Sequence, residues 1–257
     1  MRIAVIGGTG HAGRAAVQEA ARRSHDVVVV GRKEPQDPVP GTTFARADVS
    51  TGEGLGEALR GVDAVVDASN IMSQNEKTAT DFFVGATEHL LAAEAAAGVG
   101  RHVVLSIVGI DEVPTGYYKA KLAQERAARA GSVPVTVVRA TQFHDFPGQI
   151  LSVTAKGPVA VVPSIPVQPV STNDVARALL DAAEAPVAGD LVQVGGPERR
   201  DLVDLARRTL EAQGRKVLVL RLRVPGEAGR AMRGGGLLLK EGRQGSERFE
   251  DWLATSR

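Results

Sequence analysis

Short runs of β-branched residues alternate with longer alanine-rich stretches over the first 140 residues of this 257-residue chain. The run Val27–Val30 is apolar at every position, which is typical of a strand buried on both faces of a parallel sheet. Within residues 81–97, Phe83, Leu90 and Ala97 recur every seven positions and predict a helix with one apolar face. Because each pair of parallel strands needs a crossover, the alternation predicts a doubly wound α/β fold.

The same reading predicts the individual elements. Strands are expected at residues 2–6, 26–30, 42–45, 62–66, 101–107, 133–139, 191–194 and 216–224. Helices are expected at 11–23, 53–59, 81–97, 117–130, 173–185 and 201–213, with Ser171 or Thr172 capping the helix from residue 173. Prolines recur from Pro147 to Pro169 and favour extended loops over long helices there. The tail from residue 226 is rich in glycine and arginine and carries no recognisable motif.

Charge and composition exclude several classes of partner. Lysine plus arginine number 31 against 30 for aspartate plus glutamate, so no excess of positive charge favours nucleic acid or an anionic membrane. The chain has no cysteine, and its five histidines lack metal-ligand spacing, so we expect no disulfide, thiolate or metal site. No apolar run is long enough to span a membrane, and glycine ends the first apolar run too early for a secretory signal. We therefore expect a cytoplasmic protein.

A glycine-rich turn directly follows the first predicted strand and opens the first predicted helix. It comprises Gly7, Gly8, Thr9, Gly10, His11, Ala12 and Gly13. A tight strand-to-helix turn needs residues without Cβ, and a helix N-terminus attracts a pyrophosphate. This context predicts a dinucleotide site on a Rossmann-type sheet. We expect one domain, with a dinucleotide-binding core at residues 1–145. Residues 146–257 are then mostly a small substrate cap, with one core strand returning near 190–194.

Residues at the ends of the second and third strands bear on the choice of cofactor. Arg32 and Lys33 stand where a carboxylate would hold a ribose hydroxyl, and two cations favour the 2′-phosphate of NADP(H) over NAD(H). The alternative is a pair of solvated surface charges. Asp48 and Val49 follow the third strand, where an acid can accept a hydrogen bond from adenine and an aliphatic side chain can pack on its ring. Asp48 as a helix N-cap is the alternative.

Ser106, Tyr117 and Lys121 form the second candidate group. Tyr117 and Lys121 are four positions apart and share one helix face. A cation there is expected to lower the pKa of the phenol, which makes Tyr117 an acid or base, while Ser106 at a strand end orients a substrate oxygen. A Tyr-x-x-x-Lys pair is also common as a surface packing pair. The glycine turn upstream favours the catalytic interpretation.

Together these motifs resemble the short-chain dehydrogenase/reductase superfamily, and more closely its atypical branch of NmrA-like proteins and NAD(P)H-dependent reductases. The similarity extends to residues 139–143 and 170–176 and covers most of residues 1–215. It implies a nicotinamide beside Tyr117, with Lys121 also holding the nicotinamide ribose. It also implies cofactor contacts from Ala140, Thr141, Gln142 and Phe143.

The chain departs from the superfamily after the fourth strand. Ala68, Ser69 and Asn70 stand where an Asn-Ala-Ala or Asn-Ala-Gly run is frequent, and we expect them to contact the cofactor. The resemblance implies a substrate pocket from segments near 70–80, 108–116, 140–165 and 225–240, which include Ile71, Val108 and His144. A structural role is the alternative for His144.

The leading hypothesis is an NADP(H)-dependent oxidoreductase that acts on a small organic carbonyl or related acceptor by hydride transfer, with Tyr117 as acid/base. The alternative is a non-catalytic, NmrA-like regulator that senses NADP(H). A sugar-nucleotide epimerase or dehydratase ranks third, because the cap is small and the sequence shows no phosphate-binding pattern in it. The expected partner is a small-molecule substrate; nothing in the sequence indicates the oligomeric state.

Overall fold

The computed structural model describes residues 1–73 and 75–255. Gln74, in the expected pocket segment 70–80, and Ser256 and Arg257, at the end of the expected cap, lie outside the described residues. The chain divides into two compact units. Unit 1 comprises Met1–Ser106, Gly116–Arg139 and Val175–Val192, and unit 2 comprises Ile107–Thr115, Ala140–Asp174 and the chain from Gln193 onward. The predicted core at residues 1–145, with a cap and a core strand returning near 190–194, stays a prediction; in the structure residues 107–115 and 140–145 group with unit 2, and residues 175–192 with unit 1.

An eight-stranded sheet confirms the doubly wound α/β prediction. Its order is β12-β9-β6-β5-β4-β1-β2-β3, and the neighbours run parallel. The strands are β1 (Arg2–Ile6), β2 (Asp26–Gly31), β3 (Thr42–Arg46), β4 (Ala64–Asp67), β5 (Arg101–Ile107), β6 (Val135–Ala140), β9 (Leu191–Gly195) and β12 (Arg243–Gln244). Val27 to Val30 of β2 are all at most 3% exposed, as expected for a strand covered on both faces.

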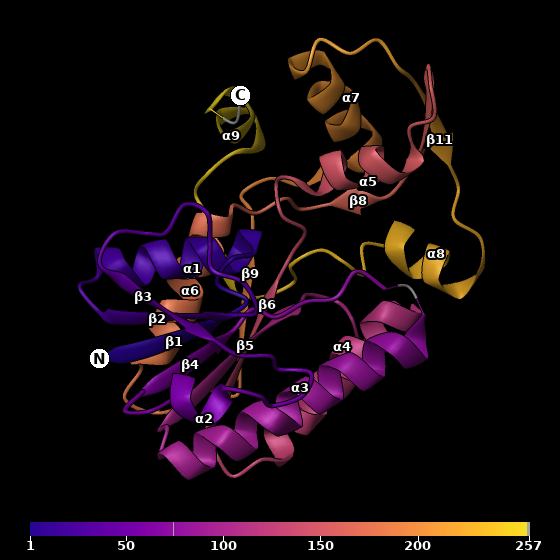
Figure 1. The fold of residues 1–257 in the computed structure, drawn as a ribbon. Helices are drawn as coiled ribbons and strands as arrows, with labels where there is room; N and C mark the ends of the chain where they lie inside the picture. Colours follow the sequence, from indigo (N-terminus) through magenta and orange to yellow (C-terminus); the bar gives the residue numbers. More distant parts are fainter. Residues whose placement is uncertain (74, 256–257) are drawn as a thin grey trace. The chain divides into compact units, whose positions relative to one another are not determined.

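The helices that cover this sheet lie on both of its faces (Figure 1). They are α1 (His11–Arg22), α2 (Leu55–Ala58), α3 (Glu76–Ala97), α4 (Gly116–Ala130) and α6 (Thr172–Glu184). Helix α3 begins five residues before the predicted start, because Asn75 Oδ1 accepts a hydrogen bond from the Thr78 amide at 2.9 Å. Its polar first turn carries no apolar periodicity, so the pattern located only the later turns. No helix of the described chain is long and apolar enough to cross a membrane.

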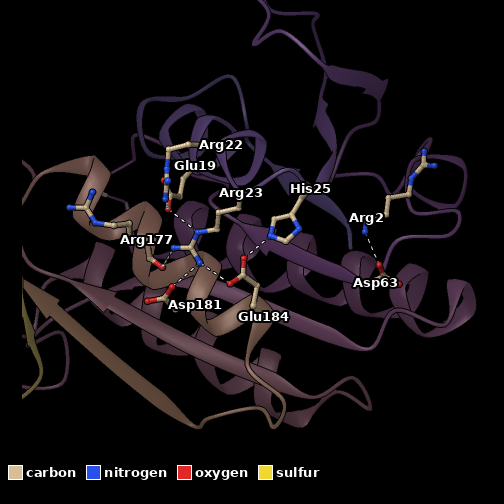
Figure 2. Close-up of polar contacts among 9 residues, drawn as sticks. All are labelled: Arg2, Glu19, Arg22, Arg23, His25, Asp63, Arg177, Asp181 and Glu184. Atoms are coloured by element: carbon tan, nitrogen blue, oxygen red, sulfur yellow. Dashed lines mark hydrogen bonds and ion pairs between the residues drawn. The ribbon is translucent and has the colours of Figure 1, made fainter.

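A charged network joins α1 to α6 within unit 1 (Figure 2). Arg23 Nη1 lies 2.8 Å from both Asp181 Oδ1 and Glu184 Oε2. His25 Nε2 reaches the other oxygen of Glu184 at 2.6 Å, and Arg23 Nε binds Glu19 at 2.8 Å. These five side chains therefore connect the end of the first helix to a helix far along the chain.

Unit 2 contains elements of which the sequence predicted two, the helix at 201–213 and the strand at 216–224. They are α5 (Phe146–Thr154), β7 (Val159–Pro163), β8 (Pro166–Val167), β10 (Arg200–Asp201), α7 (Leu202–Ala212), β11 (Leu218–Leu222), α8 (Gly226–Arg233) and α9 (Phe249–Thr255). Strand β7 pairs with β11 in parallel, and β8 pairs with β10 antiparallel. Pro147 stands in the first turn of α5, where a missing N–H costs nothing. The expectation of loops through this segment therefore missed a helix. At α6, Ser171 is the capping residue, because its Oγ accepts from the Asp174 amide at 3.0 Å.

Candidate active site

In the glycine turn between β1 and α1, backbone atoms lie so close together that Gly7 and Gly13 have no room for a side chain. Gly7 has a φ of 68° and accepts a hydrogen bond from the Gly10 amide at 2.9 Å. A Cβ at Gly13 would lie 2.1 Å from the Gly7 oxygen, and one at Gly7 would lie 2.9 Å from the Ala68 oxygen. Side chains at these positions would therefore displace the backbone, and only glycine keeps the turn.

The N-terminus of α1 offers donors to an anion. Gly10 is its N-cap residue and supplies no side-chain acceptor to the first turn, and Thr9 and His11 beside it are exposed. Backbone N–H groups and the helix dipole at such an end suit a phosphate. The glycine cradle and this uncapped helix end fit the pyrophosphate of a dinucleotide.

The two predicted cations follow β2 and are accessible. Arg32 and Lys33 are both exposed, and neither forms an ion pair or hydrogen bond with any residue in the described ranges. A Cβ on the preceding Gly31 would lie 4.0 Å from Thr9 Cγ2, so the end of β2 lies beside the glycine turn. Arg14 on α1 is a third cation that the sequence analysis missed. It is occupied, since its guanidinium contacts the Asp37 carboxylate at 2.5 Å.

Asp48 stands in a turn after β3. Its Oδ1 accepts a hydrogen bond from the Ser50 amide at 2.8 Å, and α2 starts later, after Gly54 as its N-cap residue. The helix-cap alternative for Asp48 is therefore wrong, while its contact with adenine stays a prediction. Val49 packs against the apolar cluster under β2, and its carbonyl accepts a hydrogen bond from His89 Nδ1 at 2.9 Å.

Tyr117, in the first turn of α4, keeps its proton. The hydroxyl donates to Asn70 Oδ1 at 2.7 Å, and the ring packs edge-on against Phe83 with centroids 5.8 Å apart. Burial raises the pKa of Tyr117 to about 12, although the hydrogen bond with Asn70 opposes this shift. The expectation that Lys121 lowers the pKa of Tyr117 is wrong here, because burial dominates and the ammonium is bound elsewhere.

Lys121 lies one turn further along α4 and is 4% exposed. Its Nζ donates to the Leu105 carbonyl at 2.8 Å and to Gln124 Oε1, and it lies 4.6 Å from the centre of the Phe83 ring. Gln124 in turn donates to Asp67 Oδ2 at 3.1 Å. Burial lowers the pKa of Lys121 to about 8, against the opposing charges of Asp67 and Glu125. Lys121 therefore titrates close to neutral pH.

Ser106, at the end of β5, takes part in a buried ionic network. Ser106 is 2% exposed, and its hydroxyl donates to Glu125 Oε1 at 2.5 Å. Arg139 holds the same carboxylate through Nε at 2.9 Å and Nη2 at 2.8 Å. Burial would raise the pKa of Glu125, but the hydrogen bonds from Arg139 and Ser106 lower it. Sequence reasoning missed Glu125, whose signal was its place one turn beyond Lys121.

The segment after β4 meets α4 within unit 1. The Ala68 amide donates to the Ile6 carbonyl at 3.1 Å, and the Ser69 amide donates to Asp67 Oδ1 at 2.8 Å. Asn70 binds Tyr117, as described above, and Ile71 packs against the cluster around Phe83. Unit 1 thus brings together the glycine turn, residues 68–71 and the Tyr117 and Lys121 pair.

The remaining predicted residues lie in unit 2 and make internal contacts there. The Val108 amide donates to the Ala140 carbonyl at 2.9 Å, Thr141 Oγ1 donates to the Gln168 carbonyl, and Gln142 Oε1 accepts from the Gln168 amide at 3.3 Å. Phe143 forms a bridge with Val170.

His144 is 2% exposed and stacks on Trp252 with ring centres 5.5 Å apart. Its Nε2 lies 3.2 Å from the Glu247 carbonyl, and burial lowers the pKa of the imidazole. These contacts favour the structural alternative for His144, and its substrate role stays a prediction. No cluster of three His, Asp or Glu side chains suited to a metal ion occurs within residues 1–73 and 75–255.

Comparison with protein families returns one that is described as NAD(P)H-binding and matches residues 7–186. The match begins at the glycine turn, directly after β1, includes β2 to β8 and α1 to α6, and so covers more than half of the chain.

Two curated relatives match parts of the chain. The photosystem II assembly factor Ycf39 of Synechocystis is 32% identical over 117 residues, which are 44% of this chain and 36% of that protein. The chloroplastic divinyl chlorophyllide a 8-vinyl-reductase of Oryza sativa subsp. indica is 27% identical over 219 residues, 76% of this chain and 54% of the reductase. The chain thus spans about a third to a half of these relatives.

Solved structures share the fold over nearly the whole chain. MoeE5 in complex with UDP-glucose and NAD superposes with a TM-score of 0.76 at 20% identity, over 99% of this chain and 97% of its own. The triphenylmethane reductase of Citrobacter, complexed with NADP(H), gives 0.70 at 19% identity, over 94% of this chain and 93% of its own. At these identities the likeness shows the fold alone, and it agrees with the resemblance inferred from the motifs.

Proposed function

This chain belongs to the NAD(P)H-binding family, and from that premise we propose that it is an NADP(H)-dependent oxidoreductase acting on a small organic carbonyl or related acceptor. The bound dinucleotide would supply or accept the hydride. The observation that carries the proposal is the pair formed by Tyr117 and Lys121, one turn apart on α4, in the unit that holds the glycine turn. Reductases among the relatives and structural neighbours support it.

Tyr117 suits the role of proton donor in the direction of reduction. A phenol with a pKa of about 12 is protonated at neutral pH, and its O–H is held at a defined place by Asn70. Lys121, as a cation, would stabilise the tyrosinate that remains after the proton leaves. In the proposal Lys121 also holds the nicotinamide ribose.

Ser106 belongs to the proposed catalytic set, but its hydroxyl can reach a substrate only after it leaves Glu125. Its proton is directed to Glu125, so the hydroxyl must exchange Glu125 for the substrate oxygen before it can orient or polarise a carbonyl. The remaining proposed contacts to the cofactor come from Asp48, Val49 and the segments 68–70 and 140–143. The choice of NADP(H) rests on Arg32 and Lys33, which are exposed at the end of β2.

Replacing Tyr117 by Phe tests the chemistry. The variant keeps the ring that packs on Phe83 and loses the proton, so turnover of NADPH with quinones, ketones or aldehydes should fall by about 10²-fold or more. Affinity for NADPH, measured by calorimetry, should stay unchanged. Tyr118→Phe is the matched control, since it removes a neighbouring hydroxyl from the same helix. Equal turnover in the two variants would remove Tyr117 from the mechanism.

A non-catalytic NADP(H)-sensing protein is the second candidate. The relative named as an assembly factor supports it, as does the occupied hydroxyl of Ser106. Tight binding of NADPH with no consumption across the panel of acceptors would favour this candidate over the oxidoreductase.

A further inference from the structure

A hollow of about 420 Å³ lies within unit 2 and is lined by arginines. Arg199, Arg200 and Arg233 line it together with Ser164 and Asp201. The volume is far larger than the roughly 30 Å³ that one water occupies in the liquid, so the hollow admits a group of several heavy atoms.

Three separate chain segments bring these side chains together. Strand β8 pairs with β10, with Pro166 opposite Asp201 and Val167 opposite Arg200, which places Ser164 near the arginine pair. Arg233 comes from the last turn of α8. Because the segments lie far apart in the sequence, no local motif could reveal the group.

Two of the three arginines have no carboxylate partner. Arg199 Nη2 donates to the Leu239 carbonyl at 3.2 Å, and Arg233 Nη1 donates to the Val224 carbonyl at 2.5 Å. Across the described ranges, no carboxylate forms an ion pair with either guanidinium. A carbonyl satisfies one N–H and leaves the positive charge uncompensated, so both side chains retain donors and charge for an anion.

The other polar side chains of the lining form hydrogen bonds or ion pairs within the chain. Arg200 pairs with Asp204 at 2.7 Å and Glu250 at 3.3 Å, and Asp201 Oδ1 caps α7 through the Val203 amide at 2.9 Å. Ser164 Oγ accepts a hydrogen bond from Arg221 Nη1 at 3.0 Å, which leaves the hydroxyl proton for another acceptor.

We propose that this hollow binds a phosphate group, either as inorganic phosphate or diphosphate or as the phosphate of an organic ester. Guanidinium forks match phosphate oxygens in two-point hydrogen bonds, and the hollow offers two arginines without a carboxylate partner and one hydroxyl donor. The Asp201 carboxylate in the lining is occupied, since it caps α7 and accepts from Arg221 Nη1 at 3.5 Å. None of the residues that line the hollow belongs to the proposed catalytic or cofactor-binding set, so the proposal goes beyond the proposed function and its test does not depend on it.

Calorimetric titration of the full chain without dinucleotide tests the site, with inorganic phosphate, pyrophosphate and glucose 1-phosphate as probes. At least one probe should bind, and Arg199→Gln/Arg233→Gln should weaken that binding at least tenfold. Arg208→Gln/Arg215→Gln is the matched control. It removes the same charge from exposed positions of unit 2 outside the hollow and should keep the affinity of the wild type.

The probes separate the two sources of phosphate. Binding of the inorganic probes identifies the phosphate group alone as sufficient, whereas binding of glucose 1-phosphate alone identifies an organic ester. Since Arg233 also holds the Val224 carbonyl, the single variant Arg199→Gln provides a second test that leaves α8 intact, and it should weaken binding several-fold.

Three results would overturn the proposal: no binding of any probe, equal affinity in wild type and Arg199→Gln/Arg233→Gln, or an equal loss in the control pair. The glycine turn of unit 1 can also attract an anion, so only the binding lost with Arg199 and Arg233 counts for the hollow. NADPH affinity should be unchanged in these variants, which keeps this test separate from that of the proposed function.

Discussion

Cations are treated differently in two regions of this molecule. In unit 1, buried Arg139 holds the Glu125 carboxylate through two nitrogens, and buried Lys121 is linked through Gln124 to Asp67. In the hollow of unit 2, Arg199 and Arg233 meet only backbone carbonyls. Both regions gather positive charge, but in the hollow only Arg200 has carboxylate partners, Asp204 and Glu250, while Arg199 and Arg233 have none in the described ranges.

The difference distinguishes charged side chains that stabilise the fold from charged side chains that remain available to a ligand. A buried ion is costly unless a partner repays its desolvation, so Glu125 and Arg139 must stay together once folded. Arg199 is exposed and keeps its hydration without a carboxylate partner in the described chain. A cation that is partly hydrated, convergent with others and unpaired is therefore the better candidate for recognition of an anion.

The largest expected effect comes from removing the buried carboxylate. Glu125→Gln replaces the charge that Arg139 contacts with a neutral amide, and we expect the free energy of unfolding to fall by about 3–5 kcal/mol. Urea denaturation measures it. Glu57→Gln is the control, because Glu57 forms an ion pair with Arg60 at 2.8 Å in which both side chains are 75% exposed. A loss for Glu125→Gln no larger than that of the control would contradict the contrast between the two regions.

An intermediate effect is expected from Asp67, whose charge favours the protonated form of Lys121. If turnover needs the Lys121 cation, activity is full below a pKa of about 8 and is lost as the pH rises through it. Asp67→Asn should lower that pKa and move the loss to lower pH, and a decrease of one unit would cost roughly fivefold in turnover at pH 8. Asp81→Asn, in an exposed pair with Lys77, is the control. A pH profile of kcat that is identical in both variants would count against a role for Asp67.

The smallest effect on stability should follow from the unpaired cations after β2. Arg32→Gln/Lys33→Gln removes two exposed charges without partners in the described chain, so the free energy of unfolding should change by no more than about 0.5 kcal/mol. Affinity for NADPH should nevertheless fall at least tenfold, while affinity for NADH stays constant. Equal loss for both dinucleotides would show that these residues do not read the 2′-phosphate.

The fold of unit 1 was predictable because its signals are local. An apolar run such as Val27–Val30 and a glycine turn before a helix each depend on neighbours in sequence. The start of α3 and the helix α5 were missed for one reason: capping by Asn75 and a proline in the first turn are signals of a helix start without apolar periodicity. The tail after residue 225 folds into α8, β12 and α9, and no sequence motif there predicts these elements.

The candidate site was predictable only in part, because its chemistry depends on contacts across the chain. The glycine turn and the spacing of Tyr117 and Lys121 could be read directly. The direction of the Tyr117 pKa shift could not, since burial decides it against a hydrogen bond with a partner 47 residues away. Likewise, nothing near Ser106 in sequence indicated that its hydroxyl is directed to Glu125, 19 residues further along the chain.

The bond from Tyr117 to Asn70 ties chemistry to the order of a loop. A phenol has one proton and donates it to one acceptor at a time. When Tyr117 turns its proton toward a substrate, it releases the amide that fastens the segment after β4 to helix α4. In the proposed mechanism each turnover would thus break and re-form the hydrogen bond between Tyr117 and Asn70, so the backbone at Asn70 would move in step with catalysis.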